Sequence, residues 1–299
     1  MRLCVGAVSR IVVEEAARLQ VPQIVASRRQ VDIGGGYTGY DQQALVDVVK
    51  ELSDGATAVV RDHGGPYRNG DPDDDWLRSF DSDVAAGFDA LHIDVCDLPQ
   101  DDQIEALDSL CHRYANTVDI EVGGERDSQE WLDELLEVAL RQCTPTYAIT
   151  CVGGHAHADR QAGYRKSVTQ VLDVTRQYHE LGVQSKAHNM DWMGRRFDYA
   201  DALDAYNVAP EFAQVEMDAW FRLMDADDVD MVLKYAYTLG ASEWRRWFDE
   251  GEGTYYERAR CGARYLMTMP VVTEIFDKYT GTDIESRVRN EVRDAIALG

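Results

Sequence analysis

The sequence predicts an α/β protein with a (β/α)8 TIM barrel, and three observations lead to this prediction. Short apolar runs typical of buried strands alternate with amphipathic helical patterns along roughly the first 210 residues. Eight such strand–helix alternations follow one another, which is the number in this barrel. Polar residues come directly after several of the strands, where barrels of this kind carry their active sites.

Each expected strand is short and is followed by a loop and a helix, which indicates parallel strands. Ser9 is a suitable N-cap for the first helix, and Gly87 and Gly182 end two later helices. The strands are expected at residues 3–8, 21–27, 56–60, 90–95, 118–122, 147–152, 183–187 and 205–208. The helices between them are expected at residues 11–19, 45–52, 76–86, 103–114, 129–141, 168–181 and 199–203.

Length and composition fit one globular domain of 299 residues, 45% of them hydrophobic. We expect the barrel to cover about residues 1–225 and a helical C-terminal cap to cover about residues 226–299, because the last part reads as helices rich in Trp, Tyr and Arg. No apolar run approaches the ~20 residues of a membrane span. The N-terminus lacks the apolar core of a signal peptide, so we expect a cytoplasmic protein. The six cysteines show no close pairing and are expected to be reduced.

The chain is strongly acidic, with a net charge of −24. Nucleic acid and anionic membranes are therefore not expected as partners. The basic residues are five lysines and 25 arginines. Either a high-salt cytoplasm or a GC-rich genome would account for this charge composition. The aromatic C-terminal segment favours self-association into a homo-oligomer.

The third expected strand ends in Asp62 and His63, followed by a Gly-Gly-Pro turn. A carboxylate and an imidazole at this position can hold a metal ion and carry a proton. A single histidine at a strand end is more often a buried structural residue, but several at corresponding positions favour a metal site. Three imidazoles with a carboxylate suit Zn²⁺ or another divalent metal such as Mn²⁺. The other polar residues at strand ends are Asp94, Glu121, His155 or His157, His188 and Asp191.

Other features have more than one interpretation. The glycine-rich stretch 34–39 is either a phosphate cradle or an ordinary loop. Lys186 shares a strand face with His188, so it is either a Schiff-base nucleophile or a salt-bridged core lysine. His112 and His179 lie on helical patterns and are expected at the surface.

Eight motifs of the chain carry a resemblance to known proteins: Ala26-Ser27-Arg28-Arg29-Gln30-Val31, Gly35-Gly36-Tyr37-Thr38-Gly39, Asp62-His63-Gly64-Gly65-Pro66, Ala85-Ala86-Gly87-Phe88, His92-Ile93-Asp94, Glu121-Val122-Gly123-Gly124, Gly154-His155-Ala156-His157 and Ala187-His188-Asn189-Met190-Asp191. With these motifs the chain resembles the tagatose-bisphosphate aldolase subunit family that accompanies the class II aldolase. This subunit is often called non-catalytic, and some of its relatives are sugar epimerases. The zinc-dependent class II aldolases share similar motifs, so the resemblance also implies a TIM barrel.

The resemblance implies metal ligation by His63, by His188 and by one of His155 and His157. It implies that Glu121 is a ligand or lies beside the ligands, and that Asp62 carries the proton. From its position after the seventh strand, Asp191 is a second candidate base. The residues expected to bind substrate are Ser27, Gly36, Asp94, Arg195 and Asn207.

The sequence departs from the class II aldolases after the seventh strand. These aldolases have a Gly-Ser-Gly phosphate loop there, whereas this chain has Asn-Met-Asp-Trp at residues 189–192. A bisphosphate substrate is therefore not implied. We expect a metal-dependent carbon–carbon lyase acting on a ketose or a sugar-phosphate-like substrate. The alternatives are a metal-dependent sugar epimerase, a Schiff-base aldolase and a non-catalytic subunit that stabilises an aldolase.

Overall fold

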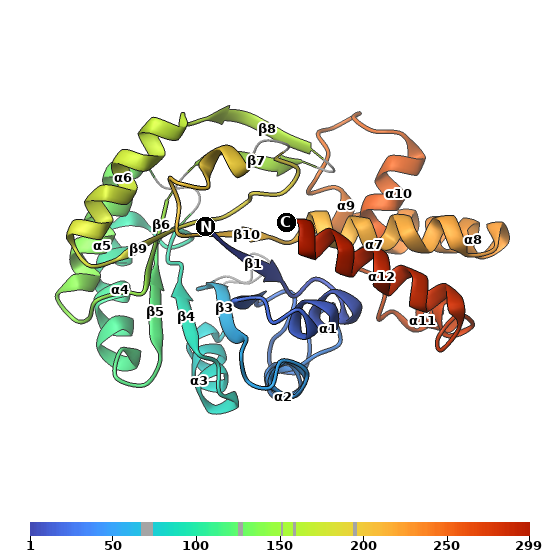
Figure 1. Ribbon diagram of the computed structural model, residues 1–299, viewed down its shortest axis with the longest axis horizontal. Coiled ribbons are helices and arrows are strands. Elements are labelled where there is room, and N and C mark those ends of the chain that lie inside the picture. Colours follow the sequence, from blue (N-terminus) through green and yellow to red (C-terminus); the bar gives the residue numbers. More distant parts are fainter. Residues whose placement is uncertain (67–73, 125–127, 151, 158–159, 194–195) are drawn as a thin grey trace.

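The computed structural model contains a closed barrel of eight parallel strands, which confirms the predicted (β/α)8 fold (Figure 1). It describes residues 1–66, 74–124, 128–150, 152–157, 160–193 and 196–299, with only the backbone for residues 153–157 and 160–164. Strand β1 pairs with both β2 and β10, and this closes the ring. The barrel strands are β1 Arg2–Gly6, β2 Gln23–Ser27, β3 Ala58–Gly64, β4 Ala90–Ile93, β5 Asp119–Val122, β6 Tyr147–Ile149, β9 Gln184–Ala187 and β10 Ala205–Val208.

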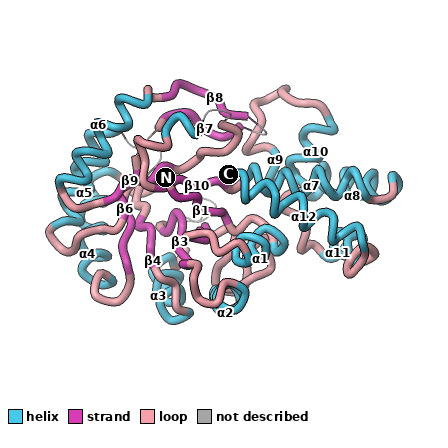
Figure 2. Tube along the Cα trace, in the orientation of Figure 1, coloured by secondary structure: helices cyan, strands magenta, loops and turns pink. Residues whose placement is uncertain are grey.

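Helices follow the strands and surround the barrel (Figure 2). Ser9 caps the first helix by accepting a hydrogen bond from the Val12 N–H, as its sequence predicts. Gly87 ends another helix in the left-handed conformation. The helix expected at 199–203 is instead a short 3-10 turn, Arg196–Tyr199. The helices around the barrel are α1 Arg10–Arg18, α2 Gln42–Leu52, α3 Trp76–Ala86, α4 Gln100–Tyr114, α5 Gln129–Leu140, α6 Val168–Glu180 and α7 Pro210–Leu223.

An antiparallel hairpin, β7 Gly153–His157 and β8 Arg160–Arg165, follows the sixth barrel strand. The sequence predicted a single strand through residue 152, with His155 and His157 just beyond its end. That prediction is wrong, because β6 pairs with β9 only over Tyr147–Ile149 and the chain then leaves the barrel. The Lys166 N–H donates to the Val152 carbonyl and closes the base of the hairpin.

The C-terminal helices extend to one side of the barrel (Figure 1). The last of them, α12, returns to the barrel, where Arg289 and Arg293 form ion pairs with Glu14 and Glu15 of α1. None of the helices in the described part of the chain combines the length and apolar composition that a bilayer crossing requires. The C-terminal helices are α8 Ala226–Leu239, α9 Ala241–Trp244, α10 Tyr255–Ala263, α11 Pro270–Asp277 and α12 Asp283–Leu298.

Candidate active site

The inner face of the barrel changes from apolar to polar toward the carboxyl ends of its strands. Because side chains alternate along a strand, the residue two positions after an inward-facing one also faces inward. Val60, Ala90 and Ala205 belong to an apolar cluster inside the barrel. The residues two positions later on these strands are Asp62, His92 and Asn207, and on the seventh barrel strand His188 follows Lys186 in the same way.

Alternation alone would turn His63 away from the interior, because it follows the inward-facing Asp62. A β-bulge prevents this. Arg61 pairs with Leu91 and Gly64 with Ile93, so β3 has one residue more than β4 between these pairs. His63 is the extra residue and has a left-handed backbone with φ of +46°. The bulge thus allows two consecutive side chains to face the mouth of the barrel.

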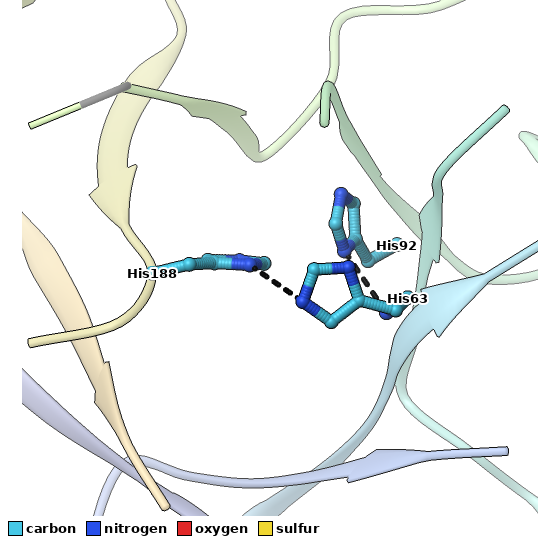
Figure 3. Close-up of side chains that lie close together, drawn as sticks. All are labelled: His63, His92 and His188. Atoms are coloured by element: carbon cyan, nitrogen blue, oxygen red, sulfur yellow. Dashed lines mark hydrogen bonds between the residues drawn. The ribbon is translucent and has the colours of Figure 1, made fainter. Parts of the chain in front are cut away.

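Three imidazoles converge at the mouth (Figure 3). His63, His92 and His188 come from three separate strand ends, and one ring nitrogen of each lies within 4.8 Å of the others. The Nδ1 atom of His188 is 3.3 Å from Nε2 of His63. His92 and His188 are buried, whereas 34% of the His63 side chain is exposed. His63 and His188, which the sequence places at the ends of the third and seventh strands, therefore lie side by side at the mouth of the barrel.

Asp94 fixes the orientation of the His63 ring. Its Oδ2 atom lies 2.7 Å from Nδ1 of His63, while Oδ1 accepts the Cys96 N–H. Burial raises the pKa of Asp94, but the hydrogen bond from His63, the nearby His92 and the hydrogen bond from Cys96 together outweigh burial and hold this pKa below its ordinary value. An ionised Asp94 places the proton of His63 on Nδ1, which leaves the Nε2 lone pair facing the mouth.

Both ring nitrogens of His92 form hydrogen bonds with backbone groups. Nδ1 accepts the His63 N–H at 3.1 Å, and Nε2 donates to the Gly123 carbonyl at 2.5 Å. His92 therefore holds the backbone of His63 in its left-handed conformation. This pattern suits a neutral positioning histidine better than a metal ligand, which needs a free lone pair aimed at the ion.

Asp62 lies beside this cluster. Its Oδ1 atom is 3.8 Å from Nε2 of His188 and accepts a hydrogen bond from Nδ2 of Asn207 at 3.4 Å. Burial raises the pKa of Asp62, but the nearby His63, His188 and His92 together outweigh burial and hold this pKa well below its ordinary value. The Oδ1 atom of Asn207 is buried and has no hydrogen-bond partner among the described residues. A polar ligand in the mouth would satisfy it.

Glu121 and Lys186 form a fully buried ion pair inside the barrel, 2.7 Å from Oε2 to Nζ. Gln23 forms hydrogen bonds with both residues. Its Nε2 atom donates to Glu121, and its Oε1 atom accepts from Lys186. Burial lowers the pKa of Lys186, but Glu121 outweighs burial and raises it. A nucleophilic lysine needs the opposite shift, so the geometry favours the salt-bridged reading of Lys186 over the Schiff base.

The remaining predicted residues occupy different positions. Asp191 accepts backbone N–H groups at the start of α7, and Ser27 pairs with Asp62 on the neighbouring strand. Gly36 lies in the loop after β2, where a Cβ atom would be 2.1 Å from the Gln30 carbonyl oxygen, so close backbone packing requires a glycine there. Arg195 and the side chains of His155 and His157 lie outside the described residues.

Sequence reasoning did not select His92 as a site residue, although it belongs to one of the motifs. It lies within a strand and not beyond its end. The available signal is the alternation that puts His92 and Asp94 on one face of the strand.

The fold and the histidine cluster define a (β/α)8 barrel with a candidate metal and acid–base site at its mouth. No protein-family model and no curated protein matches the sequence.

Solved structures do match, at low identity, and they show the fold. A probable tagatose 6 phosphate kinase from Sinorhizobium meliloti 1021 has a TM-score of 0.74 at 17% identity, covering 99% of this chain and 98% of that one. The fructuronate-tagaturonate epimerase UxaE from Cohnella laeviribosi has a TM-score of 0.66 at 11% identity, and the match covers 99% of this chain and 80% of that one. The YdjI aldolase from Escherichia coli K12 has a TM-score of 0.54 at 9% identity, and the match covers 94% of this chain and 92% of that one. Aldolases and an epimerase are thus among the structural neighbours, as the sequence resemblance indicated.

Proposed function

We propose that this chain is a divalent-metal-dependent enzyme of the aldolase type, which cleaves or forms a carbon–carbon bond in a ketose or related sugar. The observation that carries the proposal is the meeting of His63 and His188 beside the carboxylate of Asp62. A purely structural subunit has no physical need for this arrangement at the mouth of a barrel.

The residues fit a metal ion. Two nitrogen ligands of tetrahedral Zn²⁺, each bonded at about 2.0–2.1 Å, lie about 3.3 Å apart, and Nε2 of His63 and Nδ1 of His188 are 3.3 Å apart. We propose these two histidines as ligands of Zn²⁺ or Mn²⁺, with His155 or His157 as the third. A bound cation would polarise the carbonyl group of the substrate as a Lewis acid.

The reaction also needs a base for the hydroxyl group next to the bond that breaks. Asp62 is ionised at neutral pH because of its lowered pKa, and it would accept this proton. The O–H electron pair then forms a new carbonyl while the electron pair of the broken bond stays on the carbon beside the original carbonyl. Such a base contributes roughly 10²–10⁴-fold to the rate. Asn207 would accept a hydrogen bond from a substrate hydroxyl through Oδ1.

Epimerisation is the second candidate, because the same residues would catalyse it. If the released aldehyde turns over and the bond forms again on its other face, the product is an epimer. The overlap with an epimerase over 99% of this chain, at a TM-score of 0.66, supports keeping this candidate.

The proposal is tested by metal analysis of the purified chain and by a screen of ketoses and sugar acids, with products identified by NMR. We expect stoichiometric metal, loss of activity on chelation, and loss of metal in His188→Ala. His112→Ala, at an exposed helix position, is the matched control and should keep its metal. New aldehydes would identify cleavage and new diastereomers epimerisation, whereas full turnover in metal-free protein would refute the proposal.

A further inference from the structure

Phosphate groups of substrates in (β/α)8 barrels usually bind beside the loops after the seventh and eighth strands, at the N-terminus of a helix. In this chain those strands are β9 and β10, and the helix is α7. Pro210 is its first residue and has no N–H. The donors that remain at this turn are the N–H groups of Ala209 and Glu211, because Phe212 donates to the Ala209 carbonyl.

A carboxylate of the chain itself already takes both donors. Oδ1 of Asp191 accepts the Ala209 N–H at 2.9 Å and the Glu211 N–H at 2.8 Å. Asp191 is almost completely buried, at 1% exposure. Burial raises its pKa to about 7, but Oδ1 can accept both hydrogen bonds whether or not the group carries a proton.

The neighbouring arginine is engaged as well. Arg196 forms an ion pair with Glu211 through Nη1 at 2.8 Å, and the Glu211 carboxylate also accepts the Trp192 N–H at 2.6 Å. A second guanidinium, that of Arg264, is also engaged at this turn, because its Nη1 atom donates to the Pro210 carbonyl. A phosphate group entering here would therefore meet N–H donors and guanidinium groups that already have partners.

The glycine-rich loop after β2, residues 32–40, has most of its N–H groups engaged within the loop, which disfavours a second phosphate cradle there. The N–H groups of Ile33 and Tyr40 donate to side chains, and five others donate to carbonyl oxygens of the same loop and of the residues before it. The donor–acceptor pairs are Gly35 to Asp32, Gly36 to Tyr40, Tyr37 to Arg29, Thr38 to Gln30, and Gly39 to Gly36.

We propose that Asp191 is a specificity residue which fills the phosphate position of the barrel, so that the site takes an unphosphorylated ketose or sugar acid. This inference rests on the proposed function for the kind of substrate. The blocking of the anion position is a separate claim about binding, and it can be measured without activity.

Inorganic phosphate is the probe for the binding claim, with calorimetric titration of variants that have the same metal content. Wild type should bind phosphate weakly, and Asp191→Ala, which frees both N–H groups, should bind it at least about tenfold more tightly. Asp191→Asn is the matched control, because its side-chain oxygen still accepts both hydrogen bonds, and it should behave like wild type. A folded Asp191→Ala without this gain, or an Asp191→Asn with the same gain, would overturn the proposal.

A second measurement uses wild type alone and does not depend on the folding of a variant. Each active sugar is compared with its phosphorylated counterpart. We expect kcat/KM to be at least about 100-fold higher for the unphosphorylated sugar, because the donors that would bind a phosphate already have partners. A preference for the phosphorylated sugar would contradict the role of Asp191 while leaving the metal-dependent reaction intact. Absence of all activity would count against the proposed function, and the phosphate titration would then decide the binding claim by itself.

Discussion

Nδ1 of His63 and Oδ2 of Asp94 lie 2.7 Å apart across the ends of two neighbouring strands. This contact determines which nitrogen of His63 faces the mouth of the barrel. A carboxylate that accepts the N–H of a ligating histidine orients the ring and raises its basicity. Asp94, predicted as a substrate-binding residue, is therefore placed to support His63.

Replacing Asp94 by asparagine should weaken metal binding. The amide keeps the shape of the side chain but removes the negative charge beside His63. Loss of such a partner costs roughly 10–100-fold in metal affinity. Competition with a chromogenic chelator would measure the change, and Asp173→Asn, on an exposed part of α6, serves as control. An affinity equal to that of wild type would show that Asp94 does not support a ligand.

Alanine substitutions of His63 and His92 should have different effects, one on metal binding and the other on the free energy of unfolding. His92→Ala leaves the buried His63 N–H and Gly123 carbonyl without their hydrogen bonds, which should cost about 2–4 kcal/mol of the free energy of unfolding. His63→Ala removes a partly exposed side chain and should cost little stability but abolish metal binding. Urea unfolding and metal analysis of both variants would check this. Loss of metal in a folded His92→Ala with unchanged stability would instead identify His92 as a ligand.

The buried pair of Glu121 and Lys186 gives a third prediction. Lys186→Met would leave Glu121 charged and unpaired in the barrel, at a cost of about 3–5 kcal/mol. The double variant Lys186→Met, Glu121→Gln should regain a large part of this loss, which urea unfolding of the single and double variants would reveal. Borohydride with substrate should trap no adduct on wild type, whereas a trapped adduct on Lys186 would restore the Schiff-base hypothesis.

The barrel and much of its mouth could be predicted because both depend on local patterns. Strand 205–208 and helix 76–86 were predicted with the bounds that the structure has. Asp62 and His188 followed from one rule, that the carboxyl ends of parallel strands meet at one end of a barrel. The rule places residues on an end of the fold but does not say which ones touch.

The remaining features depend on contacts between distant segments. The bulge that turns His63 inward arises from the pairing of β3 with β4, and no pattern within residues 58–64 shows it. The hairpin formed by β7 and β8 is not evident from the sequence, because its first strand is Gly-Gly-His-Ala-His and lacks the apolar residues typical of a buried strand. The sequence around Asp191 does not show its hydrogen bonds with the N–H groups of Ala209 and Glu211, because these donors lie 18 and 20 residues later in the chain.

The acidic composition predicts stabilisation by salt. A net charge of −24 makes the folded chain repel itself, and salt shortens the screening length from ~10 Å at 0.1 M to ~3 Å at 1 M. The Tm should therefore rise between 0.1 M and 1 M KCl. Scanning calorimetry in KCl would measure this, with a non-ionic osmolyte as control for general exclusion effects. A Tm that stays constant or falls would mean that self-repulsion contributes little.

Glu216 should make the protein less stable as pH rises above the ordinary range of a carboxyl group. It is buried in α7, where it accepts hydrogen bonds from the Ser9 hydroxyl and the Trp220 indole N–H. Burial raises its pKa from 4.5 to about 7. The folded state therefore holds this proton more tightly than the unfolded state. The stabilisation is complete below pH 4.5 and is lost as pH rises toward 7, because only the unfolded state ionises freely in this window.

The pKa difference corresponds to roughly 3 kcal/mol over the window from pH 4.5 to 7. Glu216→Gln cannot titrate, and its amide can keep both contacts, because its oxygen can accept from the Trp220 indole N–H while its NH2 group donates to the Ser9 hydroxyl. Relative to wild type, the variant should therefore gain stability as the pH is raised from 5 to 8, as measured by urea unfolding at each pH. Burial raises the pKa of Asp191 to about 7 as well, so the stability of wild type and of Glu216→Gln falls equally where Asp191 titrates. The difference in stability between the two proteins therefore isolates Glu216. Parallel curves for wild type and variant would show that Glu216 is ionised in the folded protein throughout this range.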